Sequence, residues 1–194
     1  MTIKIRKGVF ETNSSSVHTL VFHKVDINNA VCIDEMKIYG GYYGRCPRAP
    51  LTTIEERLNY LWTGIWDNCI NDFDYEKQEW TKDEKELENW KNIIHIYCPN
   101  AILYDLSNTQ DSWTGIDHSG LLKPLLEAMK KDWELLRYFL LDPEGCVFIS
   151  GDEYDWSEEK EYFDPWLLPR VGWDNSEKII HILDDNKYIY TKGN

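Results

Sequence analysis

Residues 52–67, TTIEERLNYLWTGIWD, contain the local signal that decides the fold of the middle of the chain. Thr52 and Thr53, followed by Glu55 and Glu56, form a capping-box pattern, in which a hydroxyl and a carboxylate satisfy the first free amides of a helix. Four apolar residues then recur at helical spacing: Leu58, Leu61, Trp62 and Ile65. The pattern predicts a helix that runs to about residues 67–70.

Two more helices are predicted on the C-terminal side. A second capping box, Thr81 to Glu84, is expected to open a helix that Pro99 ends. Its apolar positions are Leu87, Trp90, Ile94 and Tyr97. The strongest helical segment is 120–141, with Ser119 as the expected N-cap.

Apolar and β-branched runs separated by turn residues predict the strands. Residues 2–10 and 17–23 are expected to pair as a hairpin, and a second hairpin is expected at 178–191, with a turn at Asp185 and Asn186. Shorter strands are predicted at 30–33, 36–39, 101–105 and 146–150, the last after a turn at 142–145. Because helices and strands do not alternate as βαβ units, the predicted class is α+β. We expect one domain over 1–194, in which a mixed or antiparallel sheet with N- and C-terminal hairpins packs against about three helices.

Composition and charge exclude several classes of protein. The hydrophobic fraction of 42% fits a folded chain, and no apolar run is long enough to span a membrane, so a cytoplasmic protein is expected. The five cysteines are widely spaced, which favours reduced, mostly buried thiols over a metal site or disulfide framework. Known nucleotide-binding and zinc-hydrolase motifs are missing, so we expect no cofactor.

The charge is strongly and unevenly acidic. The chain has 21 Lys and Arg against 34 Asp and Glu, a formal charge of −13. Residues 1–24 have four basic side chains against Glu11 alone, or +3, so the remaining residues sum to −16. Direct binding of nucleic acid by a broad basic face is therefore not expected, whereas any bound anion is expected near the N-terminus.

The most distinctive segment is 6–18, RKGVFETNSSSVH. It resembles a signature that opens many small proteins of phages and other bacterial mobile elements, and the resemblance covers residues 1–20. No settled activity comes with the signature. Since proteins of this origin often counter host defences, the resemblance implies an accessory protein that acts in the cytoplasm of a bacterial host.

The turn in this segment offers several hydrogen-bond donors. Serine hydroxyls, an amide and free backbone N–H groups lie together beside two basic residues, an arrangement that binds phosphate or carboxylate. The candidate anion-binding residues are Arg6, Lys7, Asn13, Ser14, Ser15 and Ser16. Two alternatives stay open: the turn is purely structural, or Ser15 and His18 act as nucleophile and base, or His18 as general acid, on a phosphoester.

Two acidic stretches, 71–90 and 152–164, are interleaved with aromatic residues. Dense carboxylates with aromatic neighbours suit a basic groove, although each stretch is also explained as a solvated face. The candidate partner-binding residues are Asp152, Glu153, Asp155, Trp156, Glu158, Glu159 and Glu161. Divalent-metal binding by the first three of these is an alternative that no paired ligand spacing supports, so no metal is expected.

Three functions follow as hypotheses. The first is a counter-defence inhibitor that places its acidic, aromatic-rich surface in the basic groove of a host nucleic-acid-binding protein or ribonucleoprotein, such as a CRISPR effector. The second is a small nuclease-like enzyme that uses the Asn13–His18 turn. The third is a structural or assembly protein whose N-terminal motif only folds a hairpin.

Overall fold

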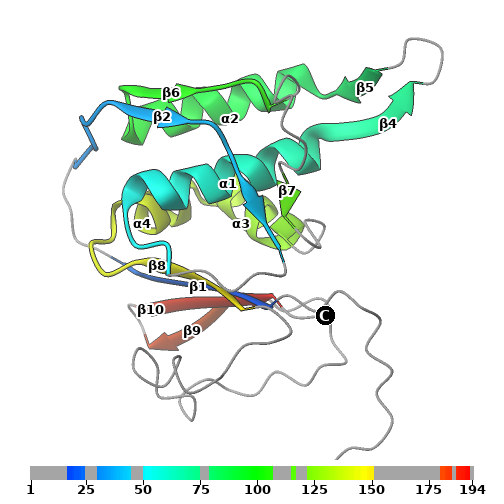
Figure 1. Cartoon of the computed structure of the whole chain (residues 1–194). Helices are drawn as coiled ribbons and strands as arrows, with labels where there is room; N and C mark the ends of the chain where they lie inside the picture. Colours follow the sequence, from blue (N-terminus) through cyan, green and yellow to red (C-terminus); the bar gives the residue numbers. More distant parts are fainter. Residues whose placement is uncertain are drawn as a thin grey trace, which may run out of the picture.

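In the computed structural model, the helix α1 (Ile54–Cys69) runs through the middle of the molecule (Figure 1). Its N-cap is Thr53, whose hydroxyl accepts a hydrogen bond from the Glu56 amide at 3.2 Å. The Glu56 carboxylate in turn accepts from the Thr53 amide at 3.0 Å. The predicted capping box is confirmed, and the helix ends within the predicted range.

The structure describes residues 17–24, 30–44, 50–74, 79–106, 115–116, 122–150, 180–184 and 187–192. The other helices in these ranges are α2 (Glu84–Tyr97), α3 (Lys123–Lys131) and α4 (Trp133–Leu141). The strands are β1 (Val17–His23), β2 (Met36–Ile38), β3 (Tyr42–Tyr43), β4 (Ile70–Asp74), β5 (Glu79–Lys82), β6 (Ala101–Leu103), β7 (Gly115–Ile116), β8 (Cys146–Ser150), β9 (Ile180–Asp184) and β10 (Lys187–Lys192). The α+β class is confirmed.

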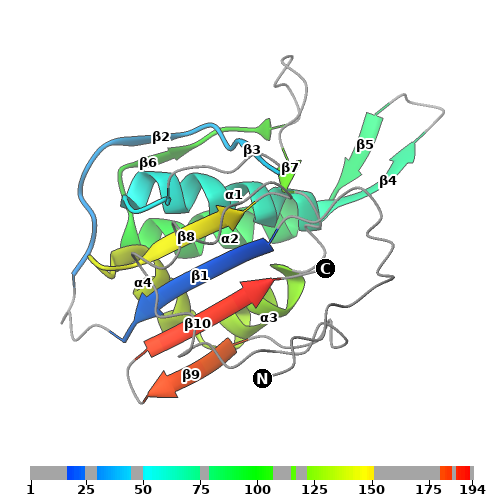
Figure 2. The same cartoon turned by 60° about the horizontal axis from the view of Figure 1, so that its bottom comes forward.

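The largest sheet has four antiparallel strands in the order β8-β1-β10-β9 (Figure 2). Thr19 of β1 pairs with Phe148 of β8 on one side and with Thr191 of β10 on the other. Both edges of β1 are therefore occupied, and the predicted hairpin between 17–23 and 2–10 is wrong; residues 2–10 lie outside the described ranges. The C-terminal hairpin, β9 with β10, is confirmed.

The elements form layers (Figure 1). The four-stranded sheet lies below α1, α3 and α4, and α2 lies above α1 together with β2 and β6. One face of β1 points into the helical layer, where Phe22 meets Phe139 of α4 edge to face, with ring centroids 5.8 Å apart. Burial of such large rings is a main source of folding free energy.

Three short strand pairs complete the described fold. β2 pairs with β6 and β3 with β7, both parallel, and β4 forms an antiparallel hairpin with β5. The strands predicted at 36–39, 101–105 and 146–150 are confirmed. The strand predicted at 30–33 is wrong, because this segment makes only an isolated backbone bond, from Cys32 N to Tyr97 O at 2.8 Å, rather than a ladder.

The predicted helix starts were less accurate. α2 is capped by Asp83, whose carboxylate accepts from the Glu86 amide at 2.9 Å, while Thr81 belongs to β5, so the capping box predicted there is wrong. The segment 120–141 is two helices rather than one. Asp132 separates them, with φ −142°, and its carboxylate caps α4.

The predicted N-cap of this segment is wrong as well. α3 begins at Lys123 after Leu122, with Pro124 in its first turn, so Ser119 does not cap it. Proline suits a first turn because its missing amide would have no partner there.

The free thiols fit the sequence-based expectation in the described ranges. Cys32, Cys69 and Cys98 are buried, and Cys146 is half-buried. Burial raises the pKa of Cys69 and of Cys98 to about 12, so both stay protonated at neutral pH. Cys46 lies outside the described residues.

Replacing Thr53 with alanine is expected to lower the free energy of unfolding by about 1 kcal/mol, because the Glu56 amide loses its acceptor. Urea denaturation measures the change. Thr52→Ala is the matched control: Thr52 gives the cap only its backbone N–H, so its loss should be below about 0.5 kcal/mol. Equal losses for both variants would contradict the role of the cap.

The cap also gives a pH dependence. Hydrogen bonds from Thr53 and Thr52 lower the pKa of Glu56. A lowered folded-state pKa stabilises the protein at pH values above the ordinary glutamate pKa of about 4.3. This stabilisation is lost as the pH falls through the lowered pKa. Glu56→Gln should therefore lower the melting temperature at pH 7, and its difference from the wild type should shrink as the pH falls through the lowered pKa of Glu56.

Candidate functional site

The structure describes one of the residues predicted as a site in the N-terminal segment, His18. The others lie outside the described ranges: Arg6, Lys7, Asn13, Ser14, Ser15 and Ser16. Their anion-binding or catalytic roles stay predictions.

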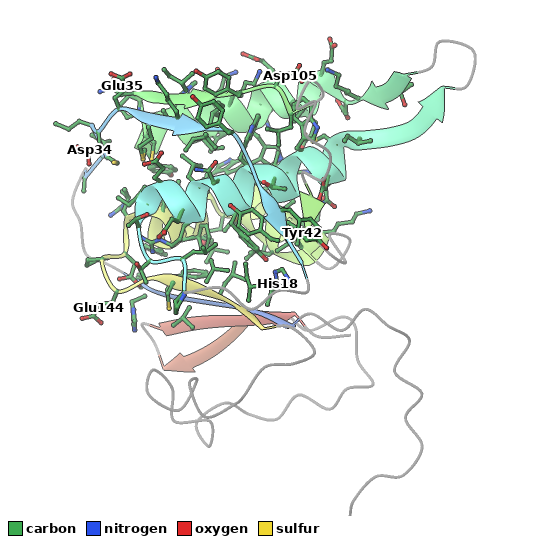
Figure 3. The ribbon with its side chains drawn as sticks, viewed as in Figure 1. His18, Asp34, Glu35, Tyr42, Asp105 and Glu144 are labelled. Atoms are coloured by element: carbon green, nitrogen blue, oxygen red, sulfur yellow. The ribbon has the colours of Figure 1, made fainter. Side chains whose placement is uncertain are left out.

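His18 is fully buried on the inner face of β1, with 0% of its surface exposed. Its Nδ1 lies 2.9 Å from the hydroxyl of Tyr60 on α1, and Figure 3 shows it between the sheet and that helix. Leu20 and Phe22 are buried at the next alternate positions of the strand. The imidazole therefore links the four-stranded sheet to the central helix.

The structure describes part of the first acidic stretch, 71–90, and none of the second, 152–164. The seven predicted partner-binding residues in 152–161 lie outside the described ranges. In the first stretch, carboxylates hold the fold: Asp83 caps α2, and Glu86 Oε1 accepts from Trp90 Nε1 at 2.9 Å and lies 2.6 Å from Lys130 Nζ. Part of the acidic character of 71–90 is thus used internally.

The described surface nevertheless stays acidic. Eleven exposed carboxylates belong to the following residues: Asp34, Glu35, Glu55, Glu56, Asp83, Glu84, Glu88, Asp105, Glu127, Asp132 and Glu144. The exposed lysines of the same ranges number five: Lys24, Lys37, Lys85, Lys123 and Lys131. This excess gives the described surface a negative potential.

Exposed large apolar side chains gather in one neighbourhood of the described structure. They are Val31, Ile33, Tyr39, Ile96, Ile102 and Tyr104, with exposed fractions from 37% for Tyr104 to 70% for Ile33. Asn100 Nδ2 donates to the Ile33 carbonyl at 2.6 Å, which places 31–33 beside the start of β6. Apolar side chains concentrated in this way are typical of an interaction surface.

The centre of this neighbourhood is the outward side of the β2–β6 pair. Met36 and Ile38 point inward and are buried, while Lys37 between them is exposed and pairs with Ile102. The Tyr104 amide donates to the Ile38 carbonyl at 3.0 Å, which extends the pair by one residue. Four residues form this surface, called the β2–β6 face below: Lys37, Tyr39, Ile102 and Tyr104.

The two tyrosines of the β2–β6 face form a stacked aromatic pair, called the tyrosine platform below. The rings of Tyr39 and Tyr104 stack with centroids 4.4 Å apart and planes inclined by 22°. A hydrogen bond with the Tyr104 side chain raises the pKa of Tyr39, so this phenol is neutral at physiological pH. Because each ring covers one face of the other, the platform offers its two outer ring faces and its hydroxyls, without adding charge.

Acidic residues lie at both ends of the β2–β6 face (Figure 3). Asp34 and Glu35 precede β2 and are exposed. Asp105 follows Tyr104 at the other end; it is half exposed and lies 3.2 Å from Lys82 Nζ. An apolar, aromatic centre between acidic ends is the surface that the described residues offer most plainly to a partner.

A polar cluster is buried on the side of α1 that faces α4 and the 142–145 turn. Arg57, 1% exposed, donates from Nη2 to the carbonyls of Leu140 and Asp142 at 3.0 and 2.8 Å. The buried Asp142 carboxylate accepts from the backbone N and Nδ1 of His23 at 2.6 and 2.8 Å. Burial lowers the pKa of Arg57, and the charge of Asp142 opposes this. The cluster ties α1, the end of β1 and the 142–145 turn together.

Gly145→Ala is expected to lower the free energy of unfolding by about 1–3 kcal/mol. A methyl group at 145 would overlap Nη1 of Arg57, which its two hydrogen bonds hold in place. Thermal and urea unfolding measure the loss. The control is Gly115→Ala, because a methyl there would meet the nearest atom, an Asp67 carboxylate oxygen, at an ordinary 3.7 Å. Equal losses at both glycines would contradict the close packing of Arg57.

A cavity of about 90 Å³ lies between α1, α2 and α3. Its lining includes Cys69, Trp90 and the Glu86–Lys130 pair. Because those charged groups bind each other, the cavity offers a ligand few free polar groups, and it is a weaker candidate than the β2–β6 face.

The β2–β6 face was not predicted from the sequence. Tyr39 and Ile102 belong to residue types that pack inside proteins, so their pattern alone suggests core positions. The sequence does show the two short strands. Which face of them is covered depends on the parallel pairing of β2 with β6, which are separated by more than 60 residues.

Within the described ranges, His, Cys, Asp and Glu side chains form no group of three placed to hold a metal ion. Those ranges also contain no helix with the length and hydropathy needed to cross a bilayer. No family model, curated protein or solved structure matches the chain.

Proposed function

We propose that this chain is a binding protein of phage or mobile-element origin that inhibits a host defence by occupying the basic groove of a nucleic-acid-handling protein. The resemblance of the N-terminal segment supports this origin. One observation supports the binding role above the others: the exposed large apolar side chains of the described structure gather on and beside one face with acidic ends.

The mechanism is exclusion of nucleic acid by an acidic competitor. Carboxylates complement the positive potential of such a groove and speed the encounter, while tyrosine and isoleucine side chains supply contacts that bare phosphate lacks. The acidic stretch at 152–161 contributes further negative charge to the chain. An inhibitor of this kind needs no cofactor and no catalytic turnover.

A panel of purified nucleic-acid-targeting effectors, including CRISPR ribonucleoproteins, tests the proposal. The protein should bind one of them, displace its nucleic acid and lose affinity steeply as salt rises from about 0.1 to 0.5 M, because the Debye length shrinks. The triple reversal of Glu158, Glu159 and Glu161 to lysine should weaken this binding.

Two results would argue against the proposal. Binding unchanged at about 0.5 M salt would remove its electrostatic basis. Cleavage of RNA or DNA by the purified protein alone would instead favour the nuclease-like hypothesis for Ser15 and His18.

A further inference from the structure

We propose that the β2–β6 face and its acidic ends hold an extended segment of the partner that presents two arginines on one side. This inference rests on the function proposed above and names the part of the partner that the face binds. Its basis is the arrangement of π-surface, apolar surface and charge along one strand pair.

The tyrosine platform fits one of the two guanidinium groups. A planar guanidinium stacks on an aromatic ring and attracts its negative face, and it simultaneously donates hydrogen bonds to a nearby carboxylate. Tyr39 and Tyr104 supply a stacked pair of rings, and Asp105, which follows directly in sequence and already contacts Lys82 Nζ through Oδ2, supplies a carboxylate. A lysine would satisfy only the charge, so arginine is the better match at this end.

The opposite end fits the second guanidinium. Asp34 and Glu35 lie there, exposed, one after the other. Tyr39 lies four residues after Glu35, which is about 13 Å at a strand rise of about 3.3 Å per residue. Because side chains alternate along an extended segment, arginines about four residues apart lie on the same side and span this distance.

The middle of the face fits an apolar side chain. Ile102 is 42% exposed at this position and is the register partner of Lys37. Lys37 is the one exposed base of the β2–β6 face and repels the proposed occupant. Removal of the Lys37 charge is therefore expected to strengthen binding. A purely hydrophobic surface would predict neither this gain nor a loss of binding when Glu35 is reversed to lysine.

The probe is a fluorescein-labelled ten-residue peptide with two arginines four residues apart and a leucine midway, measured by fluorescence anisotropy. A peptide of the same composition with the arginines five apart, on opposite sides of an extended chain, should bind several-fold more weakly. Tyr104→Ala and Glu35→Lys should each weaken binding of the first peptide about tenfold, and Lys37→Ala should strengthen it.

Glu144→Lys is the matched control, because it changes the net charge as much as Glu35→Lys but lies away from the β2–β6 face (Figure 3). Circular dichroism checks that each variant is folded. Equal weakening by Glu35→Lys and Glu144→Lys, or equal binding of the two peptides, would overturn the inference, as would a failure of the first peptide to bind.

The outcome for the proposed function is separate. If a purified effector binds the wild-type protein and the Tyr104→Ala and Glu35→Lys variants equally, the proposed function stands and the β2–β6 face is not the site. If no effector binds but the peptide assay behaves as expected, the arginine-recognising face stands and the counter-defence role fails.

Discussion

Replacing Arg57 with alanine is expected to lower the free energy of unfolding by about 3–5 kcal/mol, a large share of the roughly 5–15 kcal/mol typical of a domain. The side chain is buried, and its loss leaves the carbonyls of Leu140 and Asp142 without these donors. It also removes a positive charge that interacts electrostatically with the buried Asp142 carboxylate. Urea denaturation followed by far-UV circular dichroism measures the change.

The control is Arg57→Met, which fills a similar volume without the charge. Among the described residues, Nε and Nη1 of Arg57 have no hydrogen-bond partner, so the wild-type arginine is itself incompletely satisfied. Methionine should therefore recover part of the stability lost in the alanine variant. In the Arg57→Met background, Gly145→Ala should also cost less than in the wild type, because the overlapping guanidinium is gone. An alanine variant as stable as the wild type would show that the buried cluster contributes nothing.

Trp62→Ala is expected to have a comparable effect, about 3–5 kcal/mol. Trp62 is 0% exposed at the centre of α1, and its ring lies 6.1 Å from that of Trp66, centroid to centroid. Its Nε1 donates to the Tyr104 carbonyl at 2.9 Å. The substitution therefore removes core packing and a bond that holds β6 and the following residues against α1.

Trp62→Phe separates the two contributions. The smaller ring keeps much of the packing but loses the bond to the Tyr104 carbonyl. It should cost less than the alanine variant and, in the peptide assay, weaken binding to the β2–β6 face more than its loss of stability alone explains. If both substitutions left the unfolding midpoint unchanged, the central position of Trp62 would be contradicted.

The helices were predictable from the sequence where a local signal defines them. The capping box at Thr53 and the stripe of Leu58, Leu61 and Trp62 are short-range patterns, and α1 has them all. The break at Asp132 was missed because an aspartate inside an apolar periodicity resembles an exposed helix position. Only the extended backbone of Asp132 in the structure, with φ −142°, shows that its carboxylate caps a new helix.

Strand positions were predicted better than strand partners. The bounds of β1 and β8 agree with the predictions, yet their pairing was missed because a hairpin to the nearest strand is the simplest local assumption. At the candidate site, too, the strands were predictable but their surroundings were not. Alternation in β2 is visible in the sequence, but whether Tyr39 faces the core or the solvent depends on which side α1 covers.

The strand order β8-β1-β10-β9 has a consequence for folding during synthesis. β1 leaves the ribosome before both of its neighbours, which follow at 146–150 and 187–192, about 160 residues later for β10. At synthesis rates of about 5–20 residues per second, one edge of β1 waits roughly 10–30 s for its partner. The helices between them form from local contacts in the meantime, so the nascent chain completes its helical layer first and closes its sheet last.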